Sequence, residues 1–190
     1  DFTLVLTFMS SEPTADFIQD DITVTGGSLN SFLAISTKKY TATLTPSGDG
    51  EITIDVAAGT FTDAAGNSNI ATAPFSWTYD AIPTMIITAT NGTSEVSDGQ
   101  VTSDPLLYLT FISGEVISGF TEDDITVTNA VFSGFTTISD TVYTATLTHS
   151  EEGAVIIDVA AISFTDAADN ANAATQFNWT YDITPPTAIF

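Results

Sequence analysis

The 190-residue sequence has no cysteine, no arginine, two lysines and one histidine. The absence of cysteine excludes disulfide bonds, thiolate metal sites and a cysteine nucleophile. Lys38 and Lys39 stand against 24 acidic residues, and the formal net charge is −22. Nucleic-acid binding is excluded because it relies on Lys and Arg to replace the counterions of the phosphates, and anionic membrane surfaces are excluded likewise. A chain this acidic attracts cations, above all hard cations that prefer oxygen ligands.

The sequence also lacks long hydrophobic runs and helical periodicity. No stretch of about 18 or more apolar residues is present, so we expect no membrane insertion. Apolar residues instead alternate with polar ones, often threonine, which is typical of antiparallel strands with one face toward solvent. Examples are the segments 2–8, 40–45, 52–56 and 75–79. With 43% hydrophobic residues, the chain has enough apolar material for a core, and we do not expect disorder.

Four segments of the first half return in the second half in the same order. Trp77 recurs as Trp179, 102 positions later, and the other three matches are 103 positions apart. These three pair residues 20–25 with 123–128, 40–45 with 143–148, and 54–58 with 157–161. A period of about 100 residues is a whole domain, too long for a solenoid repeat. We therefore predict two domains of one kind at 1–80 and 81–182, followed by 183–190 as the start of a next repeat or a donor or linker tail.

The second copy is predicted to be a seven-stranded antiparallel β-sandwich, because short alternating segments are separated by Gly, Ser, Asn and Asp. We place its strands near 84–90, 105–112, 124–128, 131–138, 141–148, 154–160 and 175–181. The first copy has no counterpart of residues 81–103 and therefore lacks the first strand. Residues 183–190 align with 81–88. They either begin a third unit of a longer array or complete the open sandwich of another copy by strand addition.

Four motifs in order resemble the bacterial Ig-like repeats of large extracellular adhesins and of related algal and protist surface proteins. The motifs are Phe17 with Asp20–Thr25, Tyr40–Thr45, Asp55–Ala57 and Thr62–Asn67. The resemblance implies tandem Ig-like sandwiches, an extracellular location at a cell surface, and a spacer or adhesive role, often with calcium ions that rigidify the joints. Two departures affect turns: Gly66 becomes Asp169, and Ser11-Glu12-Pro13 becomes Gly114-Glu115-Val116.

Acidic and amide side chains gather in loops that an Ig-like topology brings to the pole where the chain enters a domain. Calcium takes six to eight oxygen ligands of this kind, so we predict Ca²⁺ at the domain junctions. The candidate ligands are Asp80, Glu115, Glu122, Asp123, Asp124, Asp166, Asp169 and Asn170, with Glu12, Asp20, Asp21, Asp63, Asn67 and Asn69 as first-domain counterparts. The spacing matches no EF-hand loop. The alternative is that Asp63 and Asp166 close Asx-type turns, with Gly66 and Asn67 supplying positive φ.

The aromatic residues of the last strand allow two interpretations. Phe75 and Trp77 alternate with Ser and Thr, so we expect them to point into the core. The alternative is a sugar-stacking platform formed by Trp77, Tyr79, Trp179 and Tyr181.

Catalytic groups are scarce. His149 is the only histidine, its counterpart is Pro46, and no Ser–His spacing supports a nucleophile. Asp20 and Asp21 are expected on a strand, where neighbouring side chains point to opposite faces and share no site. We therefore expect that this protein is not an enzyme. The sequon Asn91-Gly92-Thr93 predicts glycosylation of Asn91 in a eukaryotic source.

Together these features predict a non-enzymatic spacer repeat of a long extracellular adhesin, stalk or filament. Its partners are then neighbouring repeats of the same chain or identical subunits. Two alternatives remain open. One is a self-assembling fibre whose subunits exchange strands through the incomplete first unit, and the other is a module that binds carbohydrate or another surface.

Overall fold

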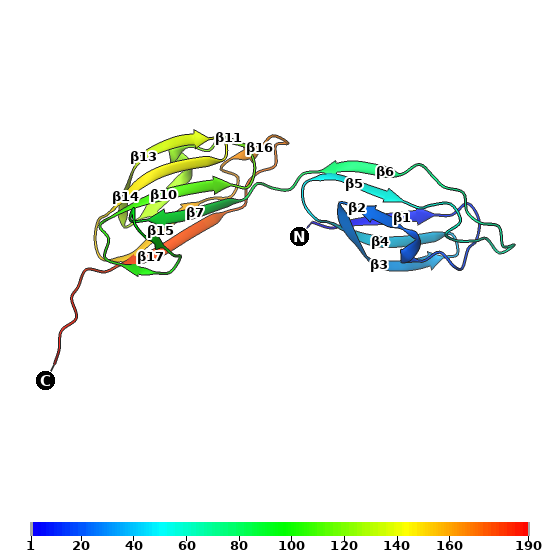
Figure 1. The fold of residues 1–190 in the computed structure, drawn as a ribbon, viewed down its shortest axis with the longest axis horizontal. Helices are drawn as coiled ribbons and strands as arrows, with labels where there is room; N and C mark the ends of the chain where they lie inside the picture. The colour runs from blue at the N-terminus through cyan, green and yellow to red at the C-terminus, as the bar shows by residue number, and fades with distance from the viewer. Residues whose placement is uncertain (1, 190) are drawn as a thin grey trace. The chain divides into compact units, whose positions relative to one another are not determined.

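The computed structural model describes residues 2–189. They form two compact units: unit 1 ends at Ala81 and unit 2 begins at Ile82. Each unit consists of β-strands arranged in facing layers (Figure 1). The helices among the described residues are two 3₁₀ turns, η1 (Gln19–Asp21) and η2 (Glu122–Asp124). The predicted fold class, tandem all-β sandwiches of the Ig-like type, is confirmed.

Unit 1 has two three-stranded antiparallel sheets. The first has the order β1-β4-β3, with β1 (Leu4–Met9), β4 (Lys39–Pro46) and β3 (Gly27–Ser36). The second has the order β2-β5-β6, with β2 (Thr23–Thr25), β5 (Gly50–Asp55) and β6 (Phe75–Tyr79).

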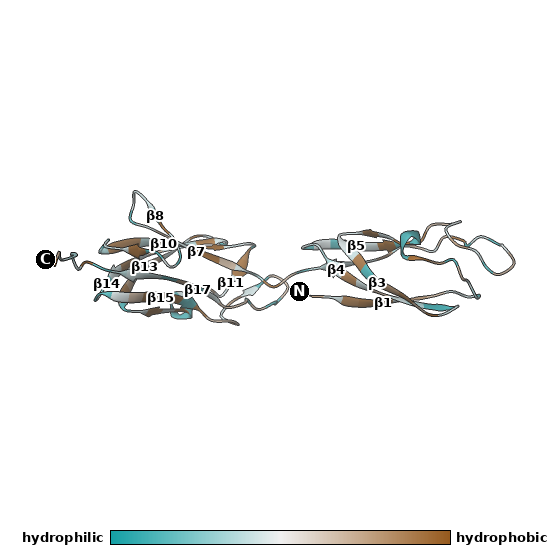
Figure 2. Cartoon of the chain, turned by 90° about the horizontal axis from the view of Figure 1, so that it is seen from below, coloured by the Kyte–Doolittle hydropathy of each residue, from teal (hydrophilic) through white to brown (hydrophobic). Residues whose placement is uncertain are grey.

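Unit 2 has a five-stranded sheet facing a four-stranded one (Figure 2). The larger sheet, β13-β14-β10-β7-β8, comprises β13 (Ala130–Ser139), β14 (Val142–His149), β10 (Leu106–Ser113), β7 (Met85–Thr90) and β8 (Glu95–Val96). The smaller sheet, β12-β15-β17-β9, comprises β12 (Ile125–Thr128), β15 (Gly153–Val159), β17 (Thr175–Tyr181) and β9 (Val101–Thr102). A separate ladder joins β11 (Ile117–Ser118) to β16 (Thr165–Asp166).

The seven strands predicted for unit 2 correspond to β7, β10, β12, β13, β14, β15 and β17. The two-residue strands β8, β9, β11 and β16 were not foreseen, because two residues carry no alternation to recognise. One pairing also differs from the predicted antiparallel pattern, since β9 runs parallel to β17. The chain reaches this position because it leaves the larger sheet after β8 and crosses to the edge of the smaller one.

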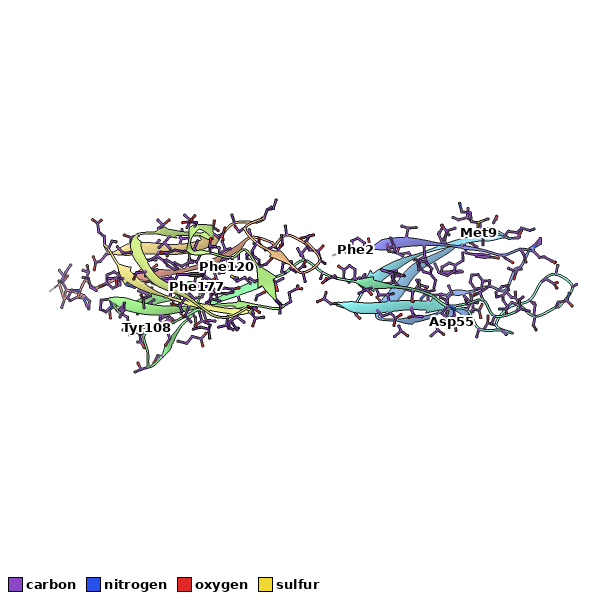
Figure 3. The ribbon with its side chains drawn as sticks, turned by 90° about the horizontal axis from the view of Figure 1, so that it is seen from above. Phe2, Met9, Asp55, Tyr108, Phe120 and Phe177 are labelled. Carbon is purple, nitrogen blue, oxygen red and sulfur yellow. The ribbon has the colours of Figure 1, made fainter. Side chains whose placement is uncertain are left out.

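The core of each unit is formed by the inward residues of the alternating strands. In unit 2, Leu107, Leu109 and Phe111 of β10 are fully buried and face the inward residues of β15 and β17. Figure 3 shows Phe120 and Phe177 between the two layers, whereas Tyr108 lies on the outside. In unit 1 the residues equivalent to those of β10 are Leu4, Leu6 and Phe8 of β1, and they are only half-buried.

The expectation that Phe75 points into the core is wrong. Its side chain is 63% exposed, whereas Phe177, the equivalent residue of unit 2, is 8% exposed. In unit 2 the start of β17 lies against β7, where the Thr175 hydroxyl donates a hydrogen bond to the Met85 carbonyl at 3.2 Å. The described part of unit 1 has no strand equivalent to β7, so Phe75 lacks this cover. Trp77 packs against the core of its unit as expected, although it is only partly buried.

Candidate functional site

The loop that contains Asp63 in unit 1 and Asp166 in unit 2 has the same geometry in both units. Asp63 Oδ1 accepts hydrogen bonds from the backbone N–H groups of Ala65 and Asn67, both at 2.8 Å, and Oδ2 accepts one from Asn67 Nδ2. These bonds, that from the Asn67 side chain foremost, lower the pKa of Asp63. The geometry is that of an Asx-type turn, the alternative considered above.

Asp166 repeats the arrangement with Ala168 and Asn170. Burial raises the pKa of its carboxyl, but hydrogen bonds led by the Asn170 side chain outweigh burial and the pKa is lowered. Gly66 has φ 89° and its counterpart Asp169 has φ 66°, so the substitution between the copies leaves the turn unchanged. Asn67 is not among the described positive-φ residues; its role is to donate hydrogen bonds.

A second asparagine holds the other side of this loop in each unit. In unit 2, Asn172 Oδ1 accepts hydrogen bonds from the backbone of Ser163 and Phe164 at 2.7 and 3.0 Å. Its Nδ2 donates to the carbonyls of Ala160 and Ala173, both at 2.8 Å. Asn69 makes the corresponding contacts in unit 1. Sequence reasoning missed Asn172, although the shared Asn-x-Asn spacing of the two copies was a visible signal.

The acidic pairs near residues 20 and 123 do not lie on strands, which corrects the expectation above. They belong to the 3₁₀ turns η1 and η2. In each turn the carboxylate of the last residue accepts a hydrogen bond from the backbone N–H of the residue that precedes the turn. Asp21 Oδ2 accepts the N–H of Ile18 at 2.8 Å, and Asp124 Oδ2 accepts the N–H of Thr121 at 2.7 Å. Asp20, Glu122 and Asp123 remain exposed on the same turns.

The predicted calcium ligands are distributed over several loops. Within either unit, the described residues place no three acidic or histidine side chains close enough together to share an ion. Four of the predicted ligands make hydrogen bonds within their own loops: Asp63, Asn67, Asp166 and Asn170. Two others, Asp21 and Asp124, cap the 3₁₀ turns. Glu12, Asp20, Asp123 and Asp169 are exposed, and Asp80 and Glu115 are half-buried. The junction calcium site remains a prediction.

Each unit holds its exit segment with an acidic side chain that the sequence reasoning had overlooked. Asp49, in the loop between β4 and β5, accepts the N–H of Ala81 at 2.8 Å. Glu152, in the equivalent loop of unit 2, accepts the N–H of Ile183 at 2.7 Å and the Thr184 hydroxyl at 2.8 Å. We call these contacts the exit clamps. Their signal in the sequence was an acidic residue at matching positions of both copies.

The single histidine belongs to a ring cluster at the end of unit 2. His149 Nε2 accepts a hydrogen bond from Trp179 Nε1 at 2.7 Å, and the imidazole stacks on Tyr181 at 4.2 Å between centroids. His149 Nδ1 is buried without a hydrogen-bond partner, and burial lowers the pKa of the imidazole. Trp179 is 1% exposed, so in unit 2 this tryptophan is a core residue and cannot stack on a sugar.

Asn91 lies in the loop between β7 and β8, as the sequon predicted. Its Nδ2 donates to Asp104 Oδ2 at 3.0 Å, and its Oδ1 accepts hydrogen bonds from Thr93 and Ser94. A glycan on Nδ2 would have to displace the contact with Asp104. Glycosylation of Asn91 remains a prediction.

The family model for the bacterial Ig-like domain matches residues 1–79 and again residues 80–183. The chain belongs to the bacterial Ig-like domain family. Such domains are structural and non-enzymatic, so this Ig-like chain is not an enzyme. Among the described residues, no helix has the length and apolar character needed to cross a bilayer.

Solved structures similar to the Ig-like chain include InvD of Yersinia pseudotuberculosis, with 18% identity, a TM-score of 0.30, and 98% of this chain and 55% of that chain covered. The Escherichia coli adhesin FdeC has 17% identity and a TM-score of 0.31, with 92% and 52% covered. The D00-D0 domain of intimin has 16% identity and a TM-score of 0.38, with 92% and 99% covered. The Ig-like chain thus spans about half of InvD and FdeC as solved. No curated protein sequence matches it.

Proposed function

We propose that the chain is a spacer segment of an extracellular adhesin or stalk, in which repeated Ig-like units hold a distal part away from the cell surface. The observation that carries the proposal is the exit clamp, which occurs in both units. A carboxylate accepts the backbone N–H of the second residue after the last strand, and Pro83, which follows in unit 2, is fully buried. Only Ile82 separates the clamped Ala81 from Pro83, and so short a linker limits bending.

We further propose that calcium stiffens the junction. Of the predicted junction ligands, Asp80, Glu115, Glu122, Asp123 and Asp169 are exposed or half-buried, and their carboxylates offer the oxygen donors that calcium prefers. A bound cation would also reduce the mutual repulsion of these charges. The donor set contains no sulfur or imidazole, which disfavours zinc and copper.

Distance distributions between spin labels test both parts. The chain has no cysteine, so Ser36→Cys and Thr137→Cys, on exposed ends of β3 and β13, would carry the only labels. We expect a narrow distribution that narrows further with calcium and broadens on Asp49→Ala. The matched control is Asp140→Ala, in the hairpin turn between β13 and β14. A broad distribution unaffected by Asp49→Ala contradicts the spacer. If a chelator changes neither the melting temperature nor the distance distribution, the calcium part of the proposal is wrong and the chain is a metal-free spacer.

A second candidate is the strand-exchanging fibre, and one observation favours it. In the described structure β1 pairs with β4 alone, whereas its equivalent β10 also pairs with β7. Beside this edge, a cavity of about 280 Å³ is lined by Phe8, Phe17, Tyr40 and Phe61, among others. A synthetic peptide of residues 82–96 should raise the melting temperature of unit 1 if the edge accepts a strand. No rise at millimolar peptide contradicts this candidate.

A further inference from the structure

Four neighbouring strands of the larger sheet of unit 2 contain no Asp, Glu, Lys or Arg. These are β7, β10, β13 and β14. The acidic residues of unit 2 lie mostly in the loops at the two ends, whereas the outward side of β15 in the opposite sheet carries Asp158. The fifth strand of this sheet, β8, carries the exposed Glu95, which pairs with Thr90 at the edge of the sheet. In a chain of net charge −22, four neighbouring strands without a charged residue are a local exception.

The strand register shows what covers this surface. Ile112 of β10 lies between Ile86 and Val142, Thr110 lies between Thr88 and Thr144, and Tyr108 lies between Thr90 and Thr146. The intervening residues Leu107, Leu109 and Phe111 are buried, so the three rows point outward, as Tyr108 does in Figure 3. We call these three rows, together with Val131 and Ser133 of β13, the threonine face.

Large apolar side chains on the threonine face are open to solvent. Ile86 is 63% exposed and Val131 is 59% exposed, with Tyr108 and Ile112 partly exposed between them. Exposed apolar groups that lie together and are rimmed by charge mark interaction sites. Absence of charge at the centre with polar groups at the rim is the usual composition of a protein–protein contact.

The same surface recurs in unit 1. Val5 lies opposite Thr43, and Thr7 lies opposite Thr41, while Leu33 of β3 lies on the other side of Thr41. Val5 is 70% exposed. The only charged residue in β1, β3 and β4 is Lys39. Both repeats therefore keep acidic residues off these neighbouring strands, although each has many acidic residues in its loops and unit 2 has Glu95 on the edge strand β8.

We propose that the threonine face binds the threonine face of a second copy of this chain, so that two chains associate side by side. Two chains of charge −22 repel each other wherever acidic loops approach. On the threonine face they can meet over β7, β10, β13 and β14 without opposed carboxylates, with Glu95 of β8 at the edge. The face is self-complementary, since rows of threonine and aliphatic residues can pack against the same rows across a two-fold axis. This association goes beyond the spacer role and does not depend on it.

A carbohydrate fits the threonine face less well. Sugar recognition uses aromatic platforms with amide or charged hydrogen-bonding groups, and the face offers one aromatic residue, Tyr108, and hydroxyl groups only. Strand exchange at the edge of β1 involves a different unit and a different surface, so the two modes of association can be separated by mutation.

Sedimentation velocity over a range of protein concentrations tests the proposal. We expect reversible self-association that strengthens between about 50 and 500 mM salt, because salt screens the residual repulsion of the acidic loops. Thr110→Glu, at the centre of the face, should weaken the association about tenfold or more, because a two-fold contact brings the new charge against its own copy.

The matched control is Ala154→Glu, which adds the same charge to an exposed position of β15 in the opposite sheet. It should leave the association nearly unchanged, and circular dichroism should show that both variants are folded. Association that survives Thr110→Glu, or falls equally with Ala154→Glu, overturns the proposal. A wild-type chain that stays monomeric at all salts overturns it too, and retention of that monomer on an insoluble polysaccharide would then assign the face to carbohydrate.

Discussion

In each unit a ring stacks on the tyrosine at the end of the last strand, but the ring comes from a different strand in the two units. In unit 2, Tyr181 stacks on His149, and Pro105 occupies the start of the neighbouring strand. In unit 1 the counterpart of His149 is Pro46 and that of Pro105 is Phe2, and Tyr79 stacks on Phe2 at 5.4 Å. The ring and the proline have exchanged positions, so both copies cover the tyrosine. The packing requirement at this end of the sandwich is therefore a ring on the tyrosine, from either strand.

The units differ also in how their polar loops are joined. In unit 2, Ser118 of β11 pairs with Thr165 of β16 through a short ladder. In unit 1, Asp16 replaces the ladder: its carboxylate accepts the N–H of Thr62 at 3.0 Å and the Thr62 hydroxyl at 2.6 Å. Hydrogen bonds from Thr14 and Thr62 lower the pKa of Asp16 to about 2. One contact between two loops is thus made by backbone pairing in one copy and by a side chain in the other.

The largest difference expected between the units concerns core truncation. Leu109→Ala should lower the free energy of unfolding of unit 2 by about 3 kcal/mol, because the fully buried side chain leaves a cavity. The equivalent Leu6→Ala should lower that of unit 1 by only about 1 kcal/mol, because Leu6 is half-buried. Each unit has one tryptophan, so urea titrations followed by fluorescence in Trp179→Phe and Trp77→Phe backgrounds report the units separately. Equal losses would show that the open β1 edge does not weaken the core.

A smaller difference is expected on mild acidification. Protonation of His149 turns the acceptor of the Trp179 N–H into a second donor, and burial lowers the pKa of His149 from 6.5 although Asp104 nearby opposes this. The unfolded chain therefore binds the proton more tightly, so the stability of unit 2 is complete above about pH 6.5 and falls as the pH drops below it. Unit 1, with Pro46, should not change in this range.

Thermal melts between pH 7.5 and 5 measure this effect. His149→Gln removes the titrating group and should make unit 2 independent of pH over the same range. The carboxylates with lowered pKa belong to Asp16, Asp63, Asp104 and Asp166, and their protonation lowers stability only below about pH 3.8. A loss of stability that is the same in His149→Gln would assign the effect to other groups.

The smallest expected effect concerns backbone strain. Ile162 has φ 66°, whereas its counterpart Gly59 has φ 77° and no steric penalty. The Ile162 side chain is 81% exposed and adds little to packing. Ile162→Gly should therefore stabilise unit 2 by about 0.5–1 kcal/mol, the relief of the left-handed conformation less the added entropy of glycine. Gly59→Ile should destabilise unit 1, and a destabilising Ile162→Gly would show that the isoleucine makes a favourable contact.

The main strands were predictable because alternation is a local property. The segments near 105–112 and 175–181 were placed within a residue of β10 and β17. The side chains that hold the loops and the exit segments were harder to predict. The turn at Asp63 was foreseen as an alternative, whereas Asn172 and the exit clamps depend on partners up to 32 residues away, which no local pattern records.

The sequence by itself determined that the chain is a duplicated, cysteine-free and strongly acidic β protein, because period, alternation and charge are properties of residue order and composition. Only the tertiary structure decided which acidic residues close loops or hold the exit segment, and that four strands without a charged residue lie side by side in one sheet. Those outcomes depend on strand register and on partners distant in the sequence. A residue's role in this protein follows from the strand that lies beside it, and Phe75 and Phe177, alike in sequence and unlike in burial, show this most directly.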